Sequence, residues 1–190
     1  MTGERNVSQP PALRERESVV TLRNGSRMRV RPIRPDDAAR LQALYARLSF
    51  DTVYHRFFAP KRTLPAALAL ELATLDHDRR LALVAAPDDG VDPPLIAVAR
   101  YAVIPDGTGT AETAMVVEDA WQRLGVGTRL LHDLLQAAEA RGIHTFRADV
   151  LATNQRMLRL LRRETNILRG RTSDGVAEIV FERPAARVAA

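Results

Sequence analysis

Hydrophobic positions in the first part of the chain follow two spacings, one typical of strands and one of helices. Two β-prone runs within 19–33 flank Asn24-Gly25, a dipeptide that favours a tight hairpin turn with positive φ. Further on, Leu41, Leu44, Tyr45 and Leu48 recur at helical spacing behind an acidic start at Pro35, Asp36 and Asp37. The pattern predicts one helix there and two shorter helices, over 51–58 and 64–75.

The second part of the chain predicts a meander of strands followed by alternating helices and strands. Runs at 81–86, 94–103 and 110–118 are separated by Asp-Gly turn signals, which indicates antiparallel pairing. A helical pattern then runs from Val126 to Ala138, with Gly142 as the expected C-cap. A strand over 144–151, a helix over 154–164 and a hairpin around 173–175 complete the order. The predicted class is therefore α/β, in the mixed α+β sense.

Length and composition predict a single soluble domain. The chain has 190 residues, of which 46% are hydrophobic and 27% charged. Its polar, Pro-interrupted start predicts a disordered tail over 1–17, then a domain over 18–184 and a C-terminal tail over 185–190. No run approaches the roughly eighteen apolar residues of a membrane span. The absence of cysteine excludes disulfides, thiolate metal sites and a cysteine nucleophile, so a cytoplasmic location is predicted.

The formal net charge of +5 is carried almost entirely by arginine, since Lys61 is the only lysine. Arginine favours bidentate contact with phosphate and carboxylate, so the charge suits an anionic cofactor or an acidic protein partner. The two denser arginine groups, within 27–34 and 159–163, are not interleaved with aromatic residues. We therefore predict neither a nucleic-acid nor a membrane partner.

The stretch "AWQRLGVGTRLL" (120–131) joins a predicted strand to a predicted helix. A dinucleotide fingerprint would need glycine at Leu130, and a P-loop would need a Gly-Lys-Ser/Thr sequence that is absent. What remains is Gln122-x-x-Gly125-x-Gly127 before a helix. Free N–H groups at such a helix start can bind an anion. A plain strand-to-helix turn, with glycine serving packing, fits the same residues.

This junction resembles the motif of the GNAT superfamily of acetyl-CoA-dependent N-acetyltransferases, and "VLATNQRMLRLLRRE" is similar to the next strand and helix of that family. The resemblance covers roughly 18–182. Over 29–58, which includes the Tyr-x-Arg-Phe-Phe segment from Tyr54 to Phe58, and over 111–122, the chain is similar to bacterial Pat-type protein lysine acetyltransferases. The resemblance implies a central, mostly antiparallel, splayed sheet flanked by helices.

The resemblance also implies a site for acetyl-CoA. The backbone that holds the coenzyme A pyrophosphate would be that of Arg123, Leu124, Gly125, Val126, Gly127 and Thr128. The strand segment Met115, Val116 and Val117 would pair with the pantetheine arm like an added strand and polarise the thioester carbonyl. Asn154 matches a cofactor-contacting asparagine, and it fits an ordinary helix N-cap equally well.

The reaction needs a neutral amine, and a lysine with a pKa of about 10.4 supplies one only rarely at neutral pH. In Pat-type enzymes the base is a glutamate that corresponds to Glu112. Strand alternation places Glu112, Ala114 and Val116 on one face, and we expect the carboxylate among apolar neighbours. An edge-exposed glutamate is the other interpretation. Glu118 and Asp119 are weaker candidates at the mouth of the loop.

Two departures from the family pattern bear on the acceptor side. The helix after Asn154 has no tyrosine to protonate the leaving thiolate, so no general acid is assigned. Thr165-Asn166-Ile167 replaces the usual Gly-Phe. The four histidines (His55, His77, His132 and His144) are not spaced for a metal, and none is predicted.

Three functions therefore stay open. The first is acetyl transfer to a protein lysine, with acyl-adenylate-forming enzymes as acceptors by family analogy. The second is acetyl transfer to a small-molecule amine. The third is a catalytically weak acyl-CoA-binding regulatory module, which the missing tyrosine suggests.

Overall fold

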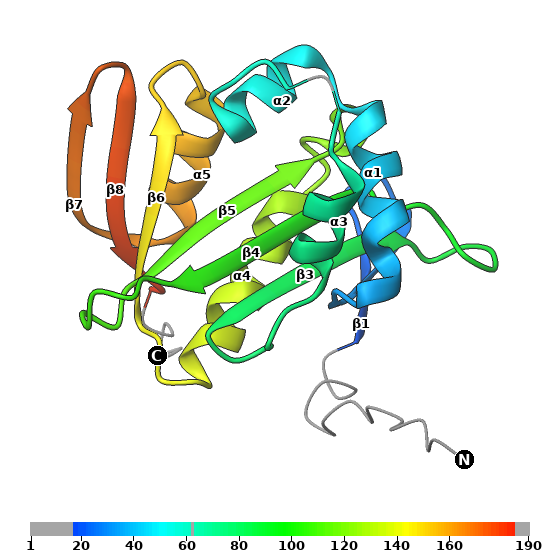
Figure 1. The fold of residues 1–190 in the computed structure, drawn as a ribbon, viewed down its shortest axis with the longest axis horizontal. Coiled ribbons are helices and arrows are strands. Elements are labelled where there is room, and N and C mark those ends of the chain that lie inside the picture. Colours follow the sequence, from blue (N-terminus) through cyan, green and yellow to red (C-terminus); the bar gives the residue numbers. More distant parts are fainter. Residues whose placement is uncertain (1–16, 62, 185–190) are drawn as a thin grey trace.

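The computed structural model describes residues 17–61 and 63–184, which form a mixed sheet with helices on both faces (Figure 1). The strands are β1 (Ser18–Thr21), β2 (Arg27–Pro32), β3 (Arg80–Pro87), β4 (Ala97–Val103), β5 (Ala111–Val117), β6 (Thr145–Leu151), β7 (Asn166–Ser173) and β8 (Val176–Glu182). The helices are α1 (Ala38–Arg47), α2 (Phe50–Phe57), α3 (Ala66–Ala73), α4 (Val126–Glu139) and α5 (Gln155–Glu164), with the 3₁₀ turns η2 (Pro35–Asp37) and η3 (Asp119–Trp121).

The sheet has the strand order β1-β2-β3-β4-β5-β6-β8-β7, and every neighbouring pair is antiparallel except β5 and β6. The parallel pair is joined through α4, as a parallel connection requires. It is also the weakest contact in the sheet, because its register includes only Ala111↔Phe146 and Glu112↔Arg147. Beyond that rung the strands part, and Figure 1 shows β6 diverging from β5 beneath α2.

Each face of the sheet carries its own apolar core. α1 and α3 cover β3 and β4 on one face, where Leu41, Leu44 and Val116 belong to the smaller cluster. α4 lies on the opposite face, where Leu130 and Leu134 belong to the larger cluster. The helical spacing of apolar residues in α1 and in α4 thus places those residues against the sheet, as the sequence predicts.

The predicted antiparallel meander corresponds to β3, β4 and β5, and the last predicted hairpin to β7 and β8 with Asp174 and Gly175 at positive φ. The first hairpin differs from the expectation of a tight Asn-Gly turn. Its five-residue connection is closed by Leu22 N–H to Ser26 O, and only Gly25 has positive φ. The Asn24 side chain instead accepts hydrogen bonds from the Ser26 N–H and hydroxyl. This side-chain turn competes with the two-residue backbone turn.

Asp37 has a different role from the predicted acidic first turn. Its side chain is 1% exposed and accepts two hydrogen bonds of 2.7 Å from Arg31 and one of 2.9 Å from Arg34 N–H. Burial alone would raise the pKa of Asp37, but these donors and the charge of Arg40 hold it below its usual value. Asp37 therefore ties α1 to β2 as a buried ion pair.

The predicted tails 1–17 and 185–190 lie outside the described residues, apart from Glu17. Within the described part of the chain, no helix is long and apolar enough to cross a membrane.

Candidate functional site

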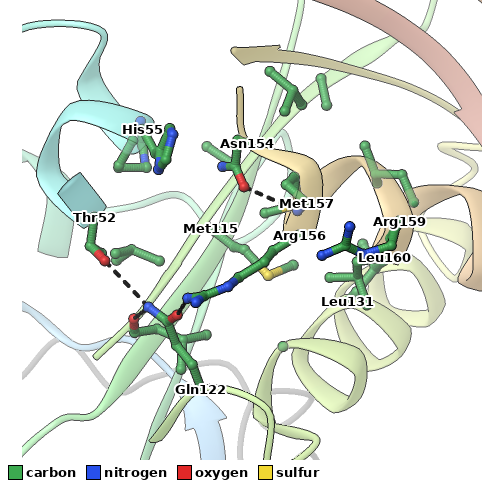
Figure 2. A pocket seen from close by; sticks show the side chains of 18 of the residues that line it. Thr52, His55, Met115, Gln122, Leu131, Asn154, Arg156, Met157, Arg159 and Leu160 are labelled. Carbon is green, nitrogen blue, oxygen red and sulfur yellow. Dashed lines mark hydrogen bonds between the residues drawn. The ribbon is translucent and has the colours of Figure 1, made fainter. Parts of the chain in front are cut away.

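A cavity of about 920 Å³ opens where β5 and β6 part. β5, β6, the loop before α4 and α5 line one side, and α2 closes the other, as Figure 2 shows for Thr52 and His55 opposite Asn154 and Met157. Of the residues predicted for a coenzyme A site, the structure places eight on this cavity: Met115, Val116, Val117, Arg123, Gly125, Gly127, Thr128 and Asn154. Leu124 and Val126 are not on its lining. Val126 is 1% exposed and belongs to the larger core, and Leu124 packs against that core.

The loop before α4 presents unpaired backbone donors. Gly125 has φ of 99° and Arg123 of 67°, so the chain turns sharply before the helix begins. Arg129 N–H bonds to Gly125 O, which leaves the N–H groups of Val126, Gly127 and Thr128 without an acceptor inside the helix. Free donors of this kind, together with the positive end of the helix dipole, can bind an anion.

The free edge of β5 faces the same cavity. Glu118 N–H bonds to Ile96 O towards β4, and backbone groups alternate in direction along a strand, so those of Met115 and Val117 point towards the gap. Val116 is the exception within the predicted segment because its backbone faces β4. The Gln122 amide donates to Val117 O at 3.1 Å and to the Thr52 hydroxyl at 3.3 Å.

Arg156 closes the gap from the opposite side. Its guanidinium donates to Gln122 Oε1 and thereby bridges α5 to the loop, as Figure 2 shows. A ligand that enters between β5 and α5 has to displace this contact. The Asn154 side chain accepts from Met157 N–H at 3.1 Å, so it caps α5 while lining the cavity, and the N-cap interpretation is confirmed.

Several cations around the cavity were not assigned from the sequence. Arg23 comes from the β1–β2 connection, and Arg159 and Arg163 come from α5. Helical spacing marks the last two as one exposed face, but a solvated face gives the same pattern. Arg23 carries no sequence signal at all, because only the fold brings it to the loop, where its N–H bonds to Leu124 O.

Glu112 lies on the last paired rung of β5, at the point where the strands part. Its side chain is 53% exposed and contacts Arg147 at 3.3 Å. The expectation that it sits among apolar neighbours is therefore wrong, because the cavity is open to water there. The Nε atom of the same Arg147 is buried and has no hydrogen-bond partner among the described residues.

Glu118 and Asp119 are occupied in holding α1 and α2. Arg47 forms two hydrogen bonds with Glu118, at 2.9 and 3.0 Å. Asp119 accepts from Ser49 N–H and from the hydroxyls of Ser49 and Thr52. Burial would raise the pKa of Asp119, but these donors hold it below its usual value. Neither carboxylate is free to act as a base.

The side of the cavity formed by α2 carries His55, which contacts Asp51 at 3.4 Å and the Thr153 hydroxyl at 3.4 Å. No tyrosine is among the described residues that line the cavity. Thr165, at the departure from the family pattern, is buried and donates to Leu161 O, so it ends α5 and does not reach the cavity.

This combination of a splayed parallel pair, a glycine loop with free donors and a cavity between them defines an acyl-CoA N-acyltransferase fold. The chain belongs to the acetyltransferase (GNAT) family, whose model matches residues 39–165. The GNAT domain of S. lividans PAT is 34% identical, with a TM-score of 0.80 over 92% of this chain and 99% of that one.

Two further proteins are similar to this chain, one in sequence and one in fold. The acetyltransferase Pat of Mycolicibacterium smegmatis is 30% identical over 76% of this chain, but the chain spans only 42% of that relative. The protein yncA of Salmonella typhimurium, solved with its cofactor acetyl-CoA, is 19% identical. Its TM-score is 0.61 over 86% of this chain and 96% of that one, which shows a likeness of fold alone.

Proposed function

We propose that this GNAT acetyltransferase moves acetyl from acetyl-CoA to the ε-amine of a protein lysine by direct attack in a ternary complex. Glu112 is the general base. The observation that carries the proposal is the position of Glu112 on the last rung before β5 and β6 part, beside the free backbone of β5. The Pat-type resemblance favours a protein lysine, and acyl-adenylate-forming enzymes are acceptors to test first.

The donor half of the cavity fits coenzyme A by its chemistry. The free N–H groups of Gly127 and Thr128 suit a pyrophosphate, and Arg23, Arg159 and Arg163 add positive charge around it. The backbone of Met115 and the N–H of Val117 are free to pair with the pantetheine arm, whereas Val117 O is held by Gln122; one of the two N–H groups would stabilise the tetrahedral oxyanion.

The acceptor amine must lose a proton as it attacks. Glu112 takes that proton once the incoming ammonium replaces Arg147 as its partner, and such exposed ion pairs contribute only about 0–1 kcal/mol. The leaving group is a thiolate, and with a thiol pKa of about 8.5 it departs without a side-chain acid. This accounts for a cavity whose described lining has no tyrosine.

The substitution Glu112→Gln tests the proposal. We expect kcat to fall by about 10²- to 10⁴-fold while the acetyl-CoA Kd stays unchanged, because only proton transfer is removed. Glu71→Gln, on the exposed face of α3, is the control and should match the wild type. Turnover is followed by release of free thiol, and the Kd by calorimetry.

Each alternative has its own outcome. Unchanged turnover in Glu112→Gln contradicts the base assignment. If acetyl is transferred to small amines but to no protein or peptide lysine, the acceptor is a small-molecule amine. Tight acetyl-CoA binding without turnover on any lysine or amine favours the regulatory module that the missing tyrosine suggests.

A further inference from the structure

One arginine lines the cavity on the face of the sheet that α2 covers, and a second lies behind it on the same face. Arg56 comes from α2 and lines the cavity. Arg100 comes from β4 and pairs with Ala114, two residues from Glu112 along β5, so it lies on the same face as Glu112. The charge of Arg56 is coupled to that of Glu112, and the charge of Arg100 to that of Arg56, so the two guanidinium groups follow one another away from the proposed base.

Neither arginine has a carboxylate partner among the described residues. The Arg56 guanidinium lies over the ring of Phe57, with 4.8 Å from its Cζ to the ring centroid. Arg100 makes one long hydrogen bond of 3.5 Å, to Leu72 O on α3. Six of the seven other arginines in the described strands form an ion pair with a carboxylate: Arg27, Arg29, Arg31, Arg80, Arg147 and Arg169.

The carboxylates on the cavity are, by contrast, all partnered. Asp51 contacts His55, and both Glu112 and Asp149 contact Arg147, at 3.3 and 3.9 Å. An acceptor ammonium can replace Arg147 at Glu112, whereas neither Arg56 nor Arg100 forms an ion pair with a carboxylate of the described residues, and only the more distant charge of Glu112 acts on Arg56. The part of the cavity around Glu112 and Arg56, here called the acceptor half, therefore offers Glu112 to a cation and Arg56 to an anion.

The electrostatics agree with this arrangement. Burial lowers the pKa of Arg56, and the charge of Glu112 opposes that effect. Burial and the nearby charge of Arg56 lower the pKa of Arg100 to about 10. Two like charges that are partly removed from water are costly, and an incoming anion relieves that cost.

We infer that Arg56, supported by Arg100, binds a carboxylate that the acceptor carries next to its reactive amine. The inference rests on the proposed function and names its substrate class, a lysine ε-amine with a carboxylate on the same or the neighbouring residue. A guanidinium binds a carboxylate through paired hydrogen bonds, which also orients the amine towards Glu112. The carboxylate has two possible sources, an acidic side chain beside a protein lysine or the α-carboxylate of a free amino acid.

Two matched pairs of acceptors test the inference and separate the sources. The first pair is a capped peptide with glutamate next to lysine and the same peptide with glutamine. The second pair is Nα-acetyl-lysine and its amide. We expect kcat/KM to be about tenfold higher for the charged member of at least one pair, given the strength of charged hydrogen bonds. The pair that shows the preference identifies the source.

The arginine variants connect the preference to the site. In Arg56→Gln and in Arg100→Gln the charged-to-neutral ratio should fall towards one, whereas Arg171→Gln, on the exposed edge strand β7, should keep the wild-type ratio. The ratio is internal to each variant, so partial loss of folded protein does not change it. In Arg56→Glu, a peptide with lysine in place of the flanking glutamate should become the better acceptor.

Equal rates for both members of both pairs overturn the inference while leaving acetyl transfer intact. A preference that survives in Arg56→Gln overturns it as well. If no acceptor turns over, the proposed function fails, and calorimetric binding of the same pairs to the coenzyme A complex decides the inference separately. Equal affinities there reject it, and tighter binding of the charged member supports it.

Discussion

The two faces of the sheet hold their helices by different means. On the face of α4, the larger apolar core fixes the helix, and the loop before it offers backbone groups to a ligand. On the face of α1 and α2, a smaller core is supplemented by charged contacts, with Asp37 on Arg31, Glu118 on Arg47, and Asp119 on the start of α2. The donor half is therefore built from main chain and apolar packing, and the acceptor half from side-chain pairs.

We expect the donor half to be similar across the family, which shares one cosubstrate, and the acceptor half to differ between enzymes with different acceptors. A backbone cradle tolerates many side chains and suits a cosubstrate that never changes. Side-chain pairs between distant segments change with single substitutions, so they suit the choice of acceptor. Breaking each kind of support should give a different result in the same assays.

The largest effect is expected at the buried ion pair. Asp37→Asn removes the charge that compensates Arg31, and the free energy of unfolding should fall by about 3–5 kcal/mol. Urea unfolding measures it. Asp36→Asn, at the exposed neighbouring position, should stay within about 0.5 kcal/mol of the wild type. Equal losses in both variants would show that Asp37 acts only through the helix dipole.

The pH dependence of stability sharpens the same point. Because the pKa of Asp37 is lowered in the folded state, its contribution is present above an unfolded pKa of about 3.9 and is lost as the pH falls through the folded pKa. Asp76, whose pKa is lowered to about 2, acts in the same direction, since Arg80 and backbone donors outweigh its burial. Below pH 4 the wild type should lose stability more steeply than Asp37→Asn. Parallel curves for the two proteins would contradict the assignment.

The donor half should break at Gly127. A Cβ there would lie 3.5 Å from Met115 Sδ and 3.7 Å from Leu160, so it fits, but a larger side chain extends into the gap between β5 and α5. For Gly127→Val we expect the acetyl-CoA Kd to rise about tenfold to hundredfold, equivalent to about 1.4–2.7 kcal/mol. Calorimetry measures it, with Gly170→Val on the open edge strand as control. An unchanged Kd would reject the cradle. Gly125 is a less clear test, because its φ of 99° strains any other residue.

The support of α2 should affect the acceptor and leave the cosubstrate unchanged. Asp119→Asn weakens the contacts to Ser49 and Thr52, and a lost cap typically costs about 1 kcal/mol. The acceptor KM should therefore rise about fivefold at an unchanged acetyl-CoA Kd. Steady-state kinetics with both substrates varied gives both values. A rise in the acetyl-CoA Kd alone would place Asp119 in the donor half.

The smallest effect is expected at the Arg156 bridge. Arg159→Ala removes one exposed cation, so the acetyl-CoA Kd should rise about two- to fivefold. Arg156→Ala removes a cation and also the contact to Gln122 that a ligand must displace, so these effects offset and its Kd should change less. Surface binding kinetics should show faster association in Arg156→Ala alone. Identical behaviour of the two variants would assign Arg156 the role of a simple cation.

The donor half could be predicted from the sequence because its signals are local. The strand, the glycines and the helix stripe from Val126 to Leu135 are contiguous, and the order of elements and the mostly antiparallel sheet followed from spacing. The capping role of Asn154 is equally local, since its partner lies three residues away. Backbone donors need no particular side chain, so the loop was recognisable from two glycines and their context.

The acceptor half could not be predicted in the same way. Arg47 meets Glu118, and Ser49 meets Asp119, across about seventy residues of sequence that no spacing rule connects. For the same reason Glu112 was expected among apolar neighbours, whereas the parting strands expose it. Arg56 could be seen only as part of a family segment, and Arg100 had no sequence signal, because only the pairing of β4 with β5 places it on the same face as Glu112.

The two-rung pairing of β5 with β6 has a consequence for the lifetime of the protein. If acetyl-CoA pairs with the free edge of β5 as proposed, the stability of the sheet depends on the supply of acetyl-CoA. At a hundred times its Kd, such a ligand adds about 2.7 kcal/mol to the free energy of unfolding. Resistance to proteolysis should then follow the concentration of acetyl-CoA, so the amount of enzyme itself would report the metabolic state that its reaction depends on.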